Sequence, residues 1–278
     1  MQTLRGRVAL VTGASRGVGR AVAVVLGEAG ATVYVSGRST RDGSTTEGLP
    51  ETIDDTVEEI NARGGRGVAV RCDHTDEQVR ALFQRIEREQ GRIDLLVNNV
   101  WGGYEQYDYA TFTAPFWEQP LGRWEGMFTA GLRAHLVASR FAAPSMLARR
   151  TGLILSTVAW ADGAYLGSLL YDVAKAAIIR MTSGMAHELR PYGVAAVALA
   201  PGFARTERVM AAHAASPFDL SGTESPEYTG RAVAALALDE DVLSRSGQVL
   251  AVGDLASEYG FTDVDGRRPE AFRMPESS

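Results

Sequence analysis

The sequence predicts an α/β fold in which a parallel β-sheet carries helices on both faces. Short runs rich in β-branched residues alternate with longer amphipathic stretches along the chain, and repeated βα units of this kind form parallel sheets. The first run, "RVALVTG" at residues 7–13, is apolar and ends in glycine, as a strand buried on both faces does. No linker or composition shift divides the 278 residues, so we expect one domain over residues 1–278.

Seven runs have the apolar, β-branched content of buried strands. They cover residues 7–13, 31–37, 67–73, 93–99, 152–157, 193–202 and 247–253. The stretches between them have the composition and periodicity of helices. These cover residues 17–30, 51–63, 76–91, 122–149, a stretch that carries Tyr171 and stops near Pro191, and 226–238. Two segments are expected to be irregular: 101–121, rich in aromatic residues, and 203–225, rich in Ala, Ser and Pro.

The composition argues against several classes of function. Net charge is −6, from 28 basic and 34 acidic residues without a basic run, so nucleic acid is not an expected partner. Cys72 is the only cysteine, which excludes an internal disulfide and an all-cysteine metal site. The histidines lack metal-ligand spacing, so no metal site is expected; they are His74, His135, His187 and His213. Neither a signal peptide nor a membrane-spanning run is recognisable, so we expect a cytoplasmic protein without a membrane partner.

Three glycines follow the first expected strand and open the first helix, within "TGASRGVG". Gly13, Gly17 and Gly19 allow the backbone to turn sharply and to approach a ligand closely. The helix that begins there offers unpaired N–H groups and the positive end of its dipole to a phosphate. The spacing G-x3-G-x-G differs from the pattern G-x-G-x-x-G, so the placement between strand and helix is what indicates a phosphate loop. An ordinary glycine turn is the alternative.

The end of the second expected strand indicates which dinucleotide would bind. NAD sites usually place an acidic residue there for the ribose 2′-hydroxyl, whereas NADP sites place a basic one. The sequence has "YVSGRST", with Arg38 and no acid, and Arg16 lies inside the glycine loop. Guanidinium groups bind phosphate with two parallel hydrogen bonds. The pattern predicts NADP(H) in preference to NAD(H), and two solvated surface arginines are the alternative.

Four motifs make the chain resemble the classical short-chain dehydrogenase/reductase (SDR) family over about residues 5–255. They are "TGASRGVG", "NN" at 98–99, "YDVAK" at 171–175 and "PGFART" at 201–206, in the family's order and roughly its spacing. "NNVWGG" and "GLRAH" are closer to the branch around human dehydrogenase/reductase SDR family member 1 than to the commonest members. The resemblance implies a single-domain Rossmann fold with a doubly wound, seven-stranded parallel sheet. It also implies an NAD(P)(H) cofactor and hydride transfer between a nicotinamide and an alcohol or carbonyl group.

The resemblance further implies roles for individual residues. The pyrophosphate loop is matched by Gly13, Ser15, Arg16, Gly17, Val18 and Gly19. The rest of the cofactor site is matched by Asp73 at the adenine amine, Asn98 by the adenine ribose, and Pro201, Gly202 and Thr206 along the nicotinamide. Tyr171 matches the catalytic acid/base. Lys175 matches the residue that binds the nicotinamide ribose and lowers the pKa of that tyrosine.

Elementary chemistry agrees with the last two roles. Residues four apart lie on one helix face, so Tyr171 and Lys175 should be neighbours. A free tyrosine has a pKa of about 10, poorly matched to chemistry near neutral pH, and a nearby cation favours the phenolate and lowers that pKa. The alternative is a partly buried tyrosine on an amphipathic helix. The preceding glycine loop favours the catalytic interpretation.

Two groups that the family commonly uses are missing from their expected positions. A serine normally follows the fifth strand, but counting from either side gives Val158 or Ala159. Ser156 and Thr157 are the nearest hydroxyls, and both are expected to lie inside the strand, where only a register shift would bring them into the slot. The family's asparagine, in the helix before that strand, falls on Gly131. Loss of one such hydrogen-bond donor can reduce a rate by a factor of about a hundred or more.

Other groups could polarise a carbonyl in place of the serine. The candidates, apart from an ordered water, are Tyr104, Tyr107, Tyr109, Trp160 and a protonated Asp162. Segments 101–121 and 203–225 are expected to line the substrate site. The aromatic residues of the first segment would suit bulky or aromatic carbonyl compounds, although they could equally form a local core or a subunit contact.

The leading hypothesis is an NADP(H)-dependent oxidoreductase of the carbonyl reductase or alcohol dehydrogenase type. One alternative is a non-catalytic NADP(H)-binding sensor or scaffold that has lost the serine and asparagine. Another is epimerisation or dehydration on the same fold. The resemblance also implies a homodimer or homotetramer, because family members commonly pair the helices before and after the fifth strand.

Overall fold

The computed structural model describes residues 3–105 and 108–273. It contains one seven-stranded sheet in the order β3-β2-β1-β4-β5-β6-β7, and every pair of neighbouring strands is parallel. The strands are β1 Val8–Thr12, β2 Thr32–Gly37, β3 Arg66–Arg71, β4 Leu95–Asn98, β5 Gly152–Thr157, β6 Val194–Ala200 and β7 Val249–Ala251. The predicted doubly wound α/β fold is therefore confirmed.

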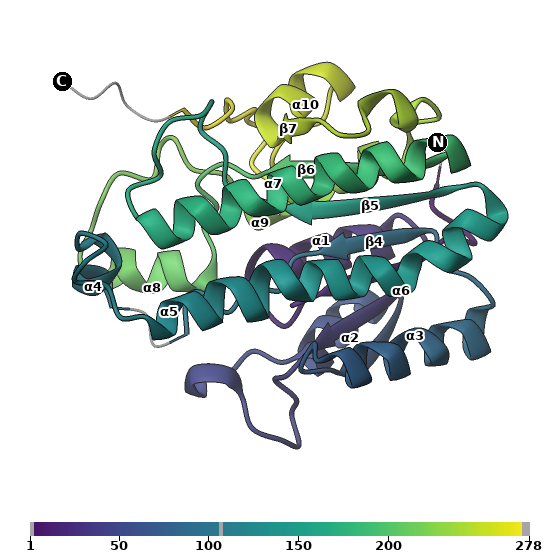
Figure 1. Ribbon diagram of the computed structural model, residues 1–278, viewed down its shortest axis with the longest axis horizontal. Coiled ribbons are helices and arrows are strands. Elements are labelled where there is room, and N and C mark those ends of the chain that lie inside the picture. The colour runs from purple at the N-terminus through teal and green to yellow at the C-terminus, as the bar shows by residue number, and fades with distance from the viewer. Residues whose placement is uncertain (1–2, 106–107, 274–278) are drawn as a thin grey trace.

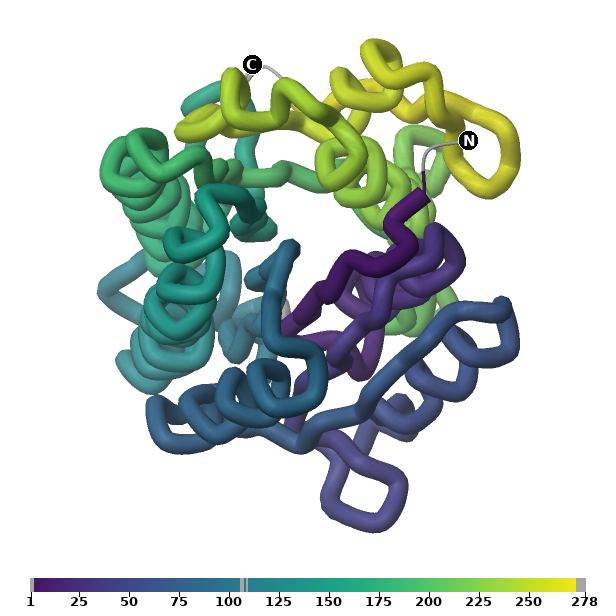
Figure 2. Tube along the Cα trace, turned by 90° about the vertical axis from the view of Figure 1, so that its right-hand side faces the viewer, coloured from purple at the N-terminus to yellow at the C-terminus, as the bar shows by residue number. Residues whose placement is uncertain are grey.

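Helices cover both faces of the sheet (Figures 1 and 2). The α-helices are α1 Gly17–Glu28, α2 Ile53–Ala62, α3 Asp76–Gln90, α4 Tyr109–Thr113, α5 Gly122–Trp124, α6 Ala134–Arg149, α7 Leu169–Leu189, α8 Glu207–Ala215, α9 Pro226–Leu238 and α10 Val252–Tyr259. The 3-10 helices are η1 Thr46–Gly48, η3 Arg190–Tyr192 and η4 Val242–Arg245, and η2 Glu125–Arg133 is π-helical. One apolar cluster joins the sheet to α1, α2, α9 and α10, and a second joins it to α3, α6 and α7.

The strand order reverses at β1, which pairs with β2 on one side and with β4 on the other. In open α/β sheets, ligands bind outside the carboxyl ends of the strands at such a switch point. The loops that follow β1, β4, β5 and β6 all leave from this edge. They carry the glycine loop, Asn99 and the segment from Pro201 to Thr206, while Arg38 follows β2 and Asp73 follows β3 at the same edge.

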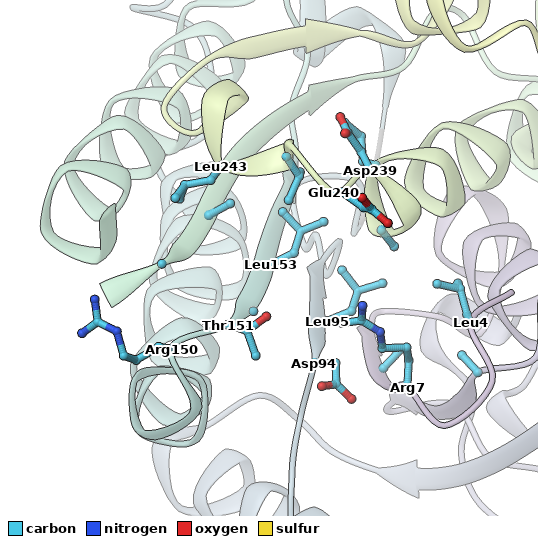
Figure 3. A pocket seen from close by; sticks show the side chains of 18 residues that line it. Leu4, Arg7, Asp94, Leu95, Arg150, Thr151, Leu153, Asp239, Glu240 and Leu243 are labelled. Atoms are coloured by element: carbon cyan, nitrogen blue, oxygen red, sulfur yellow. The ribbon is translucent and has the colours of Figure 1, made fainter. Parts of the chain in front are cut away.

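A cavity of about 360 Å³ lies at the opposite edge, where strands β1, β4, β5 and β6 begin (Figure 3). Its floor is apolar, with Leu95 and Leu153. Two of the acids that line it are paired: Asp94 binds Arg92, Arg149 and the backbone N–H of Val8, and Asp239 binds Arg245. The cavity lies at the end of the sheet away from the glycine loop and from Tyr171.

Three α-helices lie where the sequence analysis predicts none. α4 and α8 lie within the segments expected to be irregular, and α10 begins at Val252, where the last strand was expected to continue. Side-chain caps start the first two, since Asp108 accepts from the Thr111 N–H and Thr206 accepts from the Val209 N–H. α8 buries none of its residues, so its sequence lacks the apolar stripe by which helices are recognised.

The expected helix 122–149 contains a π-helical stretch, η2, between α5 and α6. Such stretches are rare and frequently lie at functional sites. Here η2 contains Gly126 and Gly131, and both pack against the segment that follows β4. A Cβ at Gly126 would lie 2.8 Å from the Gly102 carbonyl oxygen.

A buried acid folds the segment after β6 back on itself. Glu224 is 1% exposed, its backbone N–H donates to the Phe203 carbonyl, and its own carbonyl accepts from the Arg205 N–H. Its carboxylate accepts from Thr229 and fills the space where a side chain at Gly202 would be, 2.6 Å from the Cβ position. Burial raises the pKa of Glu224 to about 7.

This burial should make stability depend on pH. Between about pH 4.5 and 7 the unfolded chain ionises Glu224 while the folded chain does not, so the free energy of unfolding falls as pH rises. Glu224→Gln removes that loss, and its stability relative to wild type should grow by about 2 kcal/mol between pH 5 and pH 8. Urea unfolding at the two pH values measures the difference. The exposed Glu118→Gln should show no such growth, and equal behaviour of the two variants would contradict a buried neutral acid.

Candidate active site

The glycine loop between β1 and α1 is clamped to the end of β4. Gly13 and Gly17 adopt φ values of 65° and 56°, which favour glycine. A Cβ at Gly13 would lie 2.6 Å from the Val100 Cα, and one at Gly19 would lie 2.4 Å from the Asn99 side chain. The Asn99 amide donates to the Gly13 carbonyl at 3.0 Å. The loop is therefore held in one shape.

The N-terminus of α1 binds an anionic group. The Gly17 N–H donates to the Glu207 carboxylate of α8 at 2.8 Å, and the side chain of the N-cap residue, Arg16, makes no capping hydrogen bond. A helix N-terminus attracts negative charge through its unpaired N–H groups and its dipole. The Glu207 carboxylate occupies the kind of position that a phosphate oxygen would take. The sequence analysis did not predict this contact of Glu207.

Basic groups converge beyond the carboxyl end of β2. Arg38 forms ion pairs with Glu105 and, at 3.5 Å, with Asp73. Arg16 donates to the Ser39 hydroxyl at 3.2 Å, and its Nε forms an ion pair with the Glu51 carboxylate at 3.6 Å. A cluster of guanidinium and hydroxyl donors fits an additional phosphate. Ser39 had not been predicted to belong to this group.

The Asn98 side chain points away from the glycine loop. Its side chain is fully buried and its amide donates to the Ser139 hydroxyl of α6 at 2.9 Å. The side chain therefore turns into the helix layer and away from the glycine loop. Asn99, the next residue, reaches that loop instead, because successive strand residues point to opposite faces.

Tyr171 and Lys175 lie in the first two turns of α7, with the Lys175 Nζ 5.5 Å from the centroid of the Tyr171 ring. Burial, and secondarily the neighbouring Tyr104, raise the pKa of Tyr171 well above its usual value. Burial also lowers the pKa of Lys175 to about 7. Both effects favour the uncharged phenol and the uncharged amine. The charged forms of these two side chains therefore require stabilisation by neighbouring groups.

Aromatic rings surround the Tyr171 phenol. Trp101 meets it edge-on with ring centroids 5.7 Å apart, and Phe112 does so at 5.6 Å. Tyr104 lies nearly parallel to it at 6.3 Å, and the two hydroxyls are 3.4 Å apart. Part of the aromatic segment 101–121 therefore lies at the predicted site. Phe116 and Trp117, by contrast, meet edge-on with ring centroids 5.2 Å apart and are exposed.

Valine occupies the position expected for serine. Val158 is buried against Ile178 of α7 in a small apolar cluster that also includes Trp101. Ser156 and Thr157 lie inside β5, as expected. Thr157 lies 3.4 Å from the Asn98 carbonyl oxygen and from the Asn99 side-chain oxygen, and the buried Ser156 hydroxyl has no partner among the described residues. Neither hydroxyl bonds to Tyr171.

The remaining donor candidates are placed differently from Tyr104. Trp160 packs on the cluster around Val158. Asp162 is exposed and forms an ion pair with Arg273. Tyr107 and the side chain of Tyr109 lie outside the residues that the structure describes.

The other predicted cofactor residues lie near the same edge of the sheet. Pro201 and Gly202 directly follow β6, and Thr206 begins α8. A Cβ at Gly17 would lie 3.3 Å from the Thr206 methyl group, so the segment after β6 touches the glycine loop. Within residues 3–105 and 108–273, no group of three His, Cys, Asp or Glu side chains is arranged to hold a metal ion.

No helix in the described part of the chain is both long and apolar enough to cross a membrane.

The family model described as short chain dehydrogenase matches residues 7–216. Human dehydrogenase/reductase SDR family member 1 is 39% identical over 278 residues, which cover 95% of this chain and 85% of that protein.

Two solved structures support the same assignment. A putative dehydrogenase from Xanthomonas campestris is 27% identical, with a TM-score of 0.81 over 100% of both chains. A metagenomic short-chain oxidoreductase in complex with NADP is also 27% identical, with a TM-score of 0.69 over 90% of this chain and 98% of that one. With the family model matched over most of the chain, the protein belongs to the short-chain dehydrogenase/reductase family of oxidoreductases and is similar to its dehydrogenase/reductase member 1 branch.

Proposed function

We propose that the protein is an NADP(H)-dependent oxidoreductase acting on ketones, aldehydes or secondary alcohols. The main observation in support is the Tyr171–Lys175 pair, which lies at the same edge of the sheet as the glycine loop, near the switch point. Family membership supports redox chemistry at this place. The whole chain would act as one nucleotide-binding domain, with segments 101–121 and 203–225 as its substrate loops.

Tyr171 would exchange a proton with the substrate oxygen, while the nicotinamide, when bound, would supply or accept the hydride. Burial opposes the phenolate form of Tyr171, so the positive charge of Lys175 must counteract it. The same ammonium would hold the nicotinamide ribose. A general acid/base of this kind works best when its pKa lies near the working pH.

Tyr104 would provide the second hydroxyl. Its oxygen lies 3.4 Å from that of Tyr171, so a substrate oxygen could contact both phenols. Two donors that converge on a carbonyl oxygen stabilise the negative charge that develops there. The surrounding rings of Trp101 and Phe112 suit a bulky or aromatic substrate.

The donors of the cofactor site fit NADP(H). The α1 N-terminus would hold the pyrophosphate, with Ser15, Val18 and Thr206 beside it and the Glu207 carboxylate displaced. Arg16, Arg38 and Ser39 would hold the 2′-phosphate. Asp73 would lie at the adenine, and Pro201 and Gly202 along the nicotinamide.

Tyr171→Phe should remove nearly all turnover, because the phenol is the proposed proton donor. Tyr104→Phe should lower kcat by about ten- to a thousandfold, as removal of one such donor does. A panel of carbonyl compounds with NADPH, followed at the absorbance of the reduced nicotinamide, measures both. Unchanged turnover in Tyr171→Phe would contradict the proposed role. NADPH binding without turnover of any carbonyl or alcohol by wild type would favour the sensor or scaffold.

Arg38→Ala should weaken NADPH binding about ten- to a hundredfold and leave NADH binding nearly unchanged, because only NADPH carries the 2′-phosphate. Dissociation constants for both nucleotides measure this selectivity. Arg63→Ala is a matched control, since the Arg63 side chain is 39% exposed and that of Arg38 is 37% exposed. Equal losses for the two nucleotides would refute the assignment of Arg38.

A second copy of the chain would cover the outer face of α6 and α7. A shallow apolar groove there is lined by Phe128, Leu132, Leu136, Ala177 and Met181, between Arg133 and Arg180. Leu136 is 49% exposed. Apolar surface of this kind commonly marks an interface.

Leu136→Glu should shift sedimentation from a dimer or tetramer to smaller species, because a buried carboxylate opposes association. Leu121→Glu is the control, since Leu121 is 85% exposed and lies outside the groove. A monomeric wild type, or an unaffected Leu136→Glu variant, would exclude pairing through this face.

A further inference from the structure

The Lys175 ammonium lies against an aromatic ring. Its Nζ is 3.6 Å from the centroid of the Trp101 ring, well inside the distance of about 6 Å at which a cation is attracted by a π face. No carboxylate forms an ion pair with Lys175 among the residues that the structure describes. His135 of α6 is also within electrostatic range of Lys175, and burial together with the charge of Lys175 lowers the pKa of His135 to about 3, so this imidazole stays neutral. Of the two rings that the described ammonium approaches, Trp101 is nearer than Tyr171.

Two glycines hold the Trp101 ring in place. A Cβ at Gly131 would lie 2.8 Å from two carbons of the indole, and a Cβ at Gly103 would lie 2.7 Å from two others. Side-chain carbons do not approach other atoms so closely, so both positions require glycine while the ring stays there. The ring consequently occupies the space that a side chain at position 131 would need.

We propose that Trp101 is a positioning residue that keeps Lys175 charged. It stands in place of the family's asparagine, because the ring leaves no room for a side chain at position 131. This inference rests on the proposed function, in which the charge of Lys175 makes the Tyr171 phenol reactive. The π face attracts the ammonium but has no carboxylate charge that would neutralise it. The positive charge therefore remains available to Tyr171, whose ring contacts the same indole edge-on.

Burial and the ring act in opposite directions on Lys175. Burial alone lowers its pKa to about 7, so an amine without other support would be only partly charged near neutral pH. Attraction to a π face favours the ammonium, and this attraction grows when both groups are removed from water. Removal of the ring should therefore lower the pKa of Lys175 further.

The sequence permits a direct measurement of this effect. Lys175 is the only lysine among the 28 lysine and arginine residues, so protein labelled with isotopic lysine gives one side-chain signal. Its NMR shift, followed against pH, reports the Lys175 pKa in wild type, Trp101→Leu and Trp101→Phe. Trp101→Leu should lower the pKa by about one unit, and Trp101→Phe, which keeps a weaker π face, by less.

Matched controls separate the ring's effect from a change in folding. Trp117→Leu removes a tryptophan that is 71% exposed, and it should leave the Lys175 titration unchanged. Thermal unfolding shows whether each variant is folded. If Trp101→Leu does not fold, the graded shift in Trp101→Phe decides. A Lys175 pKa within about 0.2 unit of wild type in the folded Trp101 variants would overturn the inference.

Kinetics give a second readout. During alcohol oxidation, kcat/KM rises with pH as the Tyr171 phenol loses its proton, and a less charged Lys175 should move that rise to higher pH. The two failures are distinguishable, because the lysine titration requires no turnover. Unaltered activity in Tyr171→Phe would defeat the proposed function alone, whereas an unaltered Lys175 titration would defeat the role of Trp101 alone.

Discussion

The Lys175 amine lies in a place that excludes most water, and this burial constrains the site around it. Its side chain is 7% exposed and lies at the carboxyl edge of the sheet, beside the phenol of Tyr171. Transfer of an ammonium from water costs free energy unless another group replaces the lost hydration. Every other basic residue counted as lysine or arginine in this chain is an arginine. A guanidinium is planar and remains charged, whereas a lysine ammonium is compact and its pKa responds to its surroundings.

The Trp101 ring, which contacts Lys175, also constrains parts of the backbone. The Trp101 ring requires glycine at positions 103 and 131, and the neighbouring Gly126 must be small because it packs against the Gly102 carbonyl. Gly126 and Gly131 both lie in the π-helical stretch η2. Insertion of an extra residue per turn changes which side chains face the sheet. The irregular helix and the glycine-rich segment after β4 therefore belong to one arrangement around the indole.

The fold and the Tyr171–Lys175 pair could be predicted because they depend on local regularities. Alternation of apolar runs predicts a parallel sheet, and a spacing of four residues predicts neighbours on a helix. The side chain of Asn98 could not be placed, because its direction depends on which face of β4 it occupies. Nor could α8 be recognised, since it buries none of its residues and begins at the Thr206 cap. The contact between Trp101 and Lys175 joins the loop after β4 to α7, and no spacing within one element encodes it.

The two departures from the family pattern are connected in space. Val158 stands in the serine position and Trp101 fills the space beside Gly131, and both belong to the apolar cluster around Ile178. Replacement of a hydroxyl and an amide by apolar groups lowers the local dielectric constant, which strengthens the interaction between Lys175 and the Tyr171 phenol. The Trp101 ring fits between two glycines and contacts both Lys175 and Tyr171. Under the proposed function, this contact would stabilise charge by a different route from the serine and asparagine, with Tyr104 as the described hydroxyl that lies 3.4 Å from that of Tyr171.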